Sequence, residues 1–193
     1  MKMNYVAALG IVLILGGGAL YFFERGALSP SGGSNRAEHT LSYTNPTYGL
    51  AFTYPDTYEL TERDEEGSAL RAWHTIVLIR KEDLPMPEGG EGPPAITISL
   101  HENDLDHYTT EEWIRNVSAS NYKLGDGTLA STTISGLPAL SYRWDGLYQG
   151  TTIALAQPSW VYALTVTYLE MGAPIVQDFV QIRDSVRLSS VVP

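Results

Sequence analysis

The chain has 193 residues, of which 44% are hydrophobic, and it contains no cysteine. This hydrophobic content allows a buried core and excludes a wholly disordered chain, while the lack of cysteine excludes disulfides, thiol catalysis and cysteine-based zinc sites. The net charge of −10, from 12 basic and 22 acidic residues without a basic stripe, excludes nucleic acid as a partner.

The negative charge is concentrated in one half of the expected folded part. Residues 41–112 hold 15 acidic and 4 basic residues, a net of −11, whereas residues 113–193 hold 5 of each. Such a surface keeps a protein soluble, and it would also attract a basic partner or a cation. Secreted eukaryotic domains of this size often carry disulfides, so the absence of cysteine favours a prokaryotic source.

The N-terminal part contains an uncharged apolar stretch at residues 5–23 (YVAALGIVLILGGGALYFF). As a helix it would be about 28 Å long, close to the hydrocarbon thickness of a bilayer. We therefore expect residues 1–25 to form a single transmembrane anchor, with the rest of the chain extracytoplasmic. The alternative is a signal peptide that is cleaved near Ala19, which would release a secreted protein.

After this stretch, residues 26–40 are rich in glycine and serine and predict a flexible linker. The folded domain is then expected over residues 41–193. Its first strand is predicted at residues 48–54 (YGLAFTY), which run into a turn at Pro55. Residues 61–67 are highly charged and predict a loop or the tip of a hairpin.

Two further strands follow. Residues 70–80 (LRAWHTIVLIR) are apolar on both alternating faces, which is typical of an interior strand. Residues 81–94 are rich in proline and glycine and predict a long surface loop. Residues 95–101 (AITISLH) alternate strictly, with isoleucine and leucine on one face and threonine, serine and histidine on the other, so we expect a strand with one wet face.

The second half predicts two helices and a meander of strands. Thr109 and Glu112 fit a capping box, from which a helix should run to about residue 119. A second helix is expected to open near Pro174 and to bury a stripe of apolar residues. Between the helices, turn residues separate four predicted strands at residues 128–134, 139–144, 147–155 and 160–169. The expected fold class is therefore α+β, with helices packed on an antiparallel sheet.

Four short motifs, in this order and spacing, are similar to those of the PsbP-like family. They are an aromatic-Pro step at residues 52–55 (FTYP), a helix start at residues 109–113 (TTEEW), a turn at residues 136–139 (GLPA) and a helix end at residues 184–187 (DSVR). The resemblance covers about residues 41–188. It implies a PsbP/Mog-type α/β/α sandwich with a central antiparallel sheet, in a prokaryotic membrane-anchored version. It also implies a binding or scaffolding module without catalytic machinery.

One polar cluster is a candidate metal site. Residues 101–107 (HENDLDH) join a predicted strand to a predicted helix and contain two imidazoles and three carboxylates. Oxygen ligands suit Ca²⁺, and histidine with carboxylate suits Zn²⁺ or Mn²⁺. The candidate ligands are His101, Asp104, Asp106 and His107. The competing interpretation is a polar loop that only assists the helix start, with no cofactor.

Three functional hypotheses follow from these patterns. The first is a membrane-tethered extracytoplasmic module that binds a protein or an envelope component without catalysis, and its acidic half would select a basic partner. The second is a metal-ion-binding domain that uses the loop at residues 101–107. The third is a hydrolase, which would need His74 or His101 beside a serine and a carboxylate, although His74 is expected to be a hydrogen-bonded core residue. The aromatic residues of the meander are expected in the core, or on a binding platform if one sheet face stays uncovered.

Overall fold

The computed structural model describes residues 39–66, 72–85 and 91–189. The predicted membrane segment at residues 5–23, the alternative cleavage site at Ala19 and nearly all of the predicted linker lie outside these residues. Among the helices that the structure describes, none has the length and apolar character needed to span a membrane.

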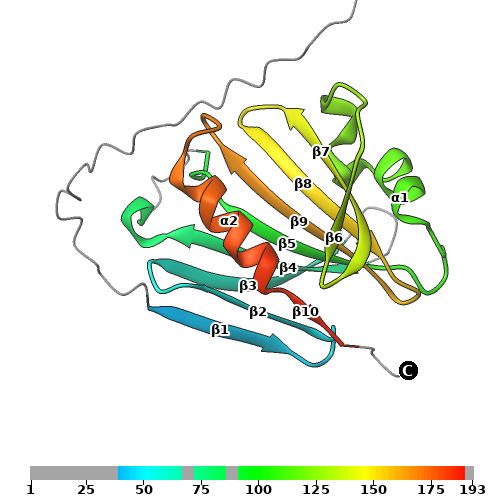
Figure 1. Ribbon diagram of the computed structural model, residues 1–193, viewed down its shortest axis with the longest axis horizontal. Coiled ribbons are helices and arrows are strands. Elements are labelled where there is room, and N and C mark those ends of the chain that lie inside the picture. The colour runs from blue at the N-terminus through cyan, green and yellow to red at the C-terminus, as the bar shows by residue number, and fades with distance from the viewer. Residues whose placement is uncertain (1–38, 67–71, 86–90, 190–193) are drawn as a thin grey trace, which may run out of the picture. The chain divides into compact units, whose positions relative to one another are not determined.

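The described residues form a seven-stranded sheet in which all neighbouring strands are antiparallel (Figure 1). In spatial order its strands are β3 (Tyr58–Glu66), β4 (Ala72–Arg80), β5 (Ile96–Glu102), β9 (Trp160–Tyr168), β8 (Gln149–Ala156), β7 (Leu137–Asp145) and β6 (Ala130–Ile134). The predicted interior strand, the predicted strand with one wet face and the meander are all confirmed. The antiparallel α+β class is confirmed with them.

A second sheet of three strands pairs residues near the end of the described part of the chain with residues near its beginning. Its order is β1 (Thr40–Asn45), β2 (Leu50–Pro55) and β10 (Arg187–Leu188), and β2 pairs antiparallel with both neighbours. The predicted strand at residues 48–54 corresponds to β2. The strands β1 and β10 were not expected. β1 has six residues and forms a hairpin with β2, whereas β10 has only two residues and pairs with a strand far away in the sequence.

Two α-helices cover opposite faces of the large sheet. In α2 (Pro174–Ser185) the predicted apolar stripe is confirmed, since Ile175, Phe179 and Ile182 are buried in the main core. In α1 (Thr110–Asn116), Trp113 and Ile114 belong to a smaller core on the other face. Figure 1 shows α2 crossing the front of the sheet.

The start of α1 is as predicted but its end is not. Thr109 Oγ1 accepts a hydrogen bond from Glu112 N (3.2 Å), and the Glu112 carboxylate accepts one from Thr109 N (2.9 Å), so the capping box is confirmed. The helix was expected to continue to residue 119, but Val117 adopts an extended conformation with φ −91° and ψ 124°. Two short 3-10 turns, Ser118–Ser120 and Tyr122–Leu124, follow it and complete the smaller core.

The prediction of a loop or hairpin tip at residues 61–67 is wrong over the residues that the structure describes. Residues 61–66 belong to β3, the edge strand of the large sheet, which pairs with β4 along its whole length. The side chains of residues 61–64 are exposed, and charged side chains on an edge strand disfavour its pairing with another chain. Glu62 and Asp64 of β3 also bind His74 of the neighbouring strand, which favours the paired conformation.

Candidate functional site

A small cavity lies on the sheet face that carries α1. We call it the His101 cavity; its volume is about 220 Å³. Its walls are side chains of five strands, β3, β4, β5, β9 and β8, together with Trp113 of α1 and Ala119. The lining residues from the strands are Arg63, Glu65, Trp73, Thr75, Thr97, Ser99, His101, Thr152, Ala163 and Thr165. Small and hydroxyl-bearing side chains therefore dominate it.

The strand register explains why these residues gather. Thr75 lies opposite Ser99, and Ser99 lies opposite Ala163, so alternate residues of three adjacent strands point to the same side. On β5 the intervening residues Ile96 and Ile98 point to the α2 side and are fully buried. The wet face predicted from the alternation of residues 95–101 is thus the floor of this cavity.

His101 is enclosed by two tryptophans. Its ring stacks on Trp73, with centroids 5.6 Å apart and an interplanar angle of 28°, and lies 5.1 Å from the ring of Trp113. Burial lowers the pKa of His101 to about 4, and the charge of Glu65 only partly opposes this effect. At neutral pH the imidazole is therefore uncharged and offers one hydrogen-bond donor and one acceptor.

Thr75 is the polar residue of this cavity that the fold leaves unsatisfied. It is 3% exposed, and among the described residues its Oγ1 is a buried side-chain oxygen without a hydrogen-bond partner. A buried hydroxyl without a partner costs about 1–3 kcal/mol. The neighbouring hydroxyls of Thr152 and Thr165 bond to each other at 2.9 Å, so they do not carry this cost.

The four predicted metal ligands are separated by the fold. His101 points into the cavity, whereas Asp104, Asp106 and His107 are exposed on the connection between β5 and α1. In the described part of the chain, no three histidine or carboxylate side chains are grouped as metal ligands would be. Binding of Ca²⁺, Zn²⁺ or Mn²⁺ by this loop stays a prediction that needs a direct titration.

The residue that organises this loop was missed by the sequence analysis. Asn103 is 2% exposed; its side-chain amide donates to the carbonyls of Tyr108 (3.0 Å) and Gln157 (2.9 Å), and its Oδ1 accepts from Tyr108 N (2.8 Å). His107 can then adopt a positive φ of 51° at the turn. An asparagine among charged neighbours carries no sequence signal that would separate it from them.

His74 is buried and hydrogen-bonded, as expected for a core histidine. Its Nδ1 lies 2.8 Å from Asp64 Oδ1 and its Nε2 lies 2.9 Å from Glu62 Oε2. The ring also stacks on Tyr48, with centroids 4.7 Å apart. Both ring nitrogens are thereby occupied by carboxylates of β3, and neither is directed at a serine.

The arrangement required for a hydrolase is only partly present. Ser99, His101 and Glu65 line the same cavity, but in the described part of the chain Ser99 and His101 share no hydrogen bond. A histidine whose pKa is about 4 is also a weak general base at neutral pH. The hydrolase hypothesis stays untested.

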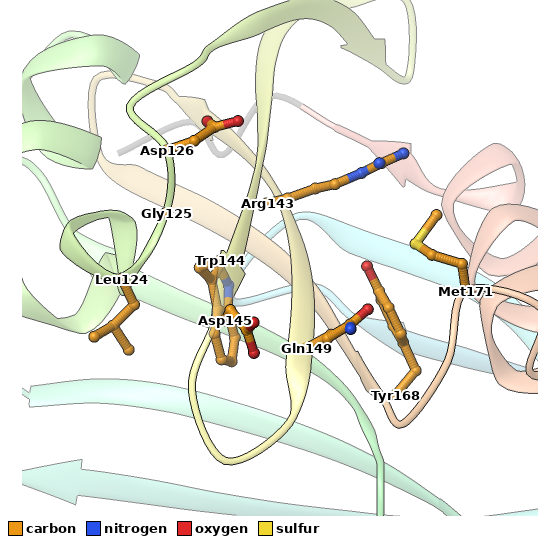
Figure 2. Close-up of a pocket in the computed structure, with 9 residues that line it drawn as sticks. All are labelled: Leu124, Gly125, Asp126, Arg143, Trp144, Asp145, Gln149, Tyr168 and Met171. Carbon is orange, nitrogen blue, oxygen red and sulfur yellow. The ribbon is translucent and has the colours of Figure 1, made fainter.

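A second hollow lies at one end of the meander, and Figure 2 shows the residues around it. We call it the Arg143 notch; its volume is about 260 Å³. Arg143 and Trp144 are neighbours on β7, so their side chains lie on opposite faces, and Arg143 extends towards the side of Met171 (Figure 2). The notch also includes the carboxylates of Asp126 and Asp145.

Exposed apolar side chains surround this notch. Leu124 and Met171 line it, and Leu147 and Leu169 lie beside it in the β7–β8 turn and after β9. All four are exposed, from 46% for Met171 to 72% for Leu169. These four residues, which we call the apolar rim, come from three separate connections of the chain.

The chain has a PsbP-like fold. A solution structure of cyanobacterial PsbP (CyanoP) from Synechocystis sp. PCC 6803 matches with a TM-score of 0.51 and 14% identity, over 85% of this chain and 100% of that one. A 1.50 Å crystal structure of a protein from Bacteroides thetaiotaomicron matches with a TM-score of 0.50 and 8% identity, over 78% of this chain. The matched region spans about half of that protein, 48% of its length. No family model and no curated protein sequence matches the chain.

Proposed function

We propose that this protein is a non-catalytic binding module of the PsbP-like α/β/α sandwich type, in a prokaryotic membrane-anchored version. Residues 5–23 tether it to a membrane, with the folded domain on the extracytoplasmic side. Its partner is a protein of the cell envelope. The single observation that carries the proposal is the apolar rim around the Arg143 notch.

The apolar rim has the character of a docking surface. Single exposed apolar residues are normal on a protein, but a contiguous group rimmed by polar residues is typical of an interaction site. Leu124 and Met171 line the notch from opposite sides (Figure 2). A Cβ at Gly146, next to Leu147, would lie 3.6 Å from Leu124 Cδ1, and Leu169 follows Tyr168, which also lines the notch. Burying such residues against a partner would supply the main favourable free energy of binding.

The charges at the rim indicate the chemistry of the partner. Asp126, Asp145 and Glu170 contribute three negative charges at the rim, against the positive charges of Arg143 and of Lys123, which precedes Leu124. The charges of the acidic half of the chain would add to this field over a longer range. The partner segment should therefore be apolar and carry basic residues at its margins.

Site-specific photo-crosslinking in membranes tests the proposal. A photoreactive amino acid is introduced at Leu147 of the full chain, and a matched control carries it at Leu41, another exposed leucine, which lies on β1. We expect ultraviolet light to produce a discrete larger adduct from position 147 and none from position 41. The double variant Asp145→Asn/Glu170→Gln should weaken the adduct, because it removes two of the three carboxylates.

Two results would contradict this function. Equal adducts from both positions would show only random collision with neighbouring proteins. No adduct from position 147 in intact membranes would show that the apolar rim has no protein partner there.

A further inference from the structure

The His101 cavity has features that the proposed docking surface does not explain. It shares no lining residue with the Arg143 notch, so the two sites can be tested separately. Thr75 lines it, and the Oγ1 of this threonine is buried without a hydrogen-bond partner among the described residues. Buried polar groups in native proteins are nearly always satisfied, so an exception inside a cavity points to a ligand.

The charges of the cavity indicate an uncharged ligand. Burial keeps the imidazole of His101 neutral at physiological pH by lowering its pKa. Arg63 and Glu65 pair with each other, Nε to Oε1 at 2.7 Å, so their charges offset each other. A small anion or cation would find no unpaired opposite charge on these residues to compensate for its loss of hydration.

The hydrogen-bonding groups indicate a ligand with hydroxyls. A threonine or serine hydroxyl both donates and accepts, and a neutral imidazole does the same through its two nitrogens. Thr75, Ser99 and His101 present this dual character along adjacent strands. Ligand hydroxyls are the matching groups, because each can also donate and accept.

The volume of the His101 cavity and its aromatic walls indicate the size and shape of the ligand. A volume of about 220 Å³ is below the range of about 300–1,000 Å³ that is typical of pockets for drug-sized molecules, so one small ring is the natural occupant. The indole of Trp73 in the wall offers an apolar surface for the C–H groups of such a ring.

We propose that the His101 cavity binds a small uncharged polyhydroxylated molecule, such as a monosaccharide or a cyclic polyol, whose hydroxyl groups hydrogen-bond to Thr75 and His101. Binding would satisfy Thr75 Oγ1, for which the described residues provide no hydrogen-bond partner. The ligand is either a free sugar or the terminal sugar of an envelope glycan, because both present the same chemistry.

The test uses the full chain in lipid nanodiscs, so that no sugar-based detergent competes. The probes are glucose, galactose, mannose, N-acetylglucosamine and myo-inositol, with acetate and lysine as charged comparators. We expect saturable binding by at least one uncharged probe in calorimetry, together with an increase in the melting temperature of the domain. We expect no saturable binding by acetate or lysine.

The variant Thr75→Val separates a ligand contact from a structural role. Valine has nearly the same shape but no hydroxyl, so the unliganded domain should be as stable as the wild type or more stable. The affinity for the binding probe should fall about tenfold, the effect of losing one buried hydrogen bond. The matched control Thr44→Val, at an exposed position on β1, should leave the affinity unchanged.

The outcomes are distinct. Binding that depends on Thr75 supports the proposal, and a comparison of each monosaccharide with its corresponding disaccharide then shows whether a free or a terminal sugar is preferred. No saturable binding by any of the five uncharged probes overturns it. Binding that is insensitive to Thr75→Val, or stronger binding by acetate or lysine, also overturns it. None of these results depends on the crosslinking at Leu147.

Discussion

At the scale of single residues, burial changes the chemistry of side chains that look alike in the sequence. His74 on β4 and His101 on β5 are only one residue out of register, since Trp73 pairs with His101 and His74 pairs with Leu100. His74 points to one side and contacts two carboxylates, whereas His101 points to the other and contacts two tryptophans. The first is a hydrogen-bond partner of β3, and the second is a neutral group in a cavity wall.

The buried state of His101 predicts a pH dependence of stability. Its pKa is about 4 in the folded protein, against 6.5 for an exposed histidine. Between these values the unfolded chain binds a proton that the folded domain does not, so the free energy of unfolding should fall as the pH falls from about 6.5 to 4. The free energy of unfolding should therefore be roughly 3 kcal/mol higher above pH 6.5 than below pH 4 on account of His101.

Urea denaturation over this pH range, in the wild type and in His101→Phe, measures this contribution. Phenylalanine keeps a ring between the tryptophans but cannot be protonated. The difference between the two proteins isolates His101 from the carboxylates, which titrate in the same range. Parallel stability curves for the two proteins would show that His101 is not buried as a neutral base.

At the scale of elements, the β7–β8 hairpin depends on one glycine. The indole of Trp144 occupies the position above Gly150, its cross-strand neighbour, and donates from Nε1 to Thr152 Oγ1 at 3.0 Å. A Cβ at Gly150 would lie 2.2 Å from Trp144 Cε2, which is too close for any real contact. Only glycine therefore allows the ring to lie flat against the strand.

Substitution of this glycine should move the ring. We expect Gly150→Ala to lower the free energy of unfolding by about 2 kcal/mol, the usual cost of overpacking. The control is Gly146→Ala in the same hairpin, where a Cβ would meet its nearest atoms at an ordinary 3.6 Å and the effect should be within about 0.5 kcal/mol.

A double-mutant cycle with Trp144→Leu completes this test by equilibrium denaturation. Once the indole is gone, adding Gly150→Ala should cost much less than in the wild type, because the clash no longer exists. Strictly additive losses would mean that the ring does not occupy the space above the glycine.

At the scale of the whole molecule, contacts between distant segments hold α2 to the edge of the large sheet. Tyr58 of β3 donates to Asp178 of α2 at 2.6 Å, and Arg80 of β4 reaches the same carboxylate at 3.3 Å. Burial, together with the hydrogen bond to Asp178, raises the pKa of Tyr58. Tyr58 and Asp178 are 120 residues apart in the sequence, so no local pattern could reveal this contact.

The membrane tether is the prediction that concerns the chain as a whole. We expect the full chain to stay in the membrane pellet after an alkaline carbonate wash, with an intact mass that includes residues 1–19. The variant Leu13→Asp/Ile14→Asp should be lost from the pellet, because each charge at the bilayer centre costs about 2.5–3.5 kcal/mol. A wild-type protein found in the wash with a new N-terminus near residue 20 would instead establish the signal-peptide alternative.

Local patterns determined the elements whose signals are contained within a few residues. The capping box at Thr109, the strict alternation of residues 95–101 and the apolar stripe of α2 all appeared as expected. These features depend on hydrogen bonds within one turn or on the period of a strand or helix. Both can be recognised from the order of neighbouring residues. The PsbP-like resemblance was based on four short motifs, one of which includes this capping box, and the solution structure of CyanoP supports it at the level of the fold.

Tertiary structure alone decided how charged and polar residues are used. Residues 61–66 became an edge strand because β4 and His74 were available to pair with their backbone and carboxylates. His101 lies beside Thr75 in a cavity wall and not with its sequence neighbours Asp104 and Asp106, because alternate residues of adjacent strands share a face. The sequence by itself determined periodicity and caps, which are local, whereas burial and partnership arise only when segments far apart in the chain are brought together.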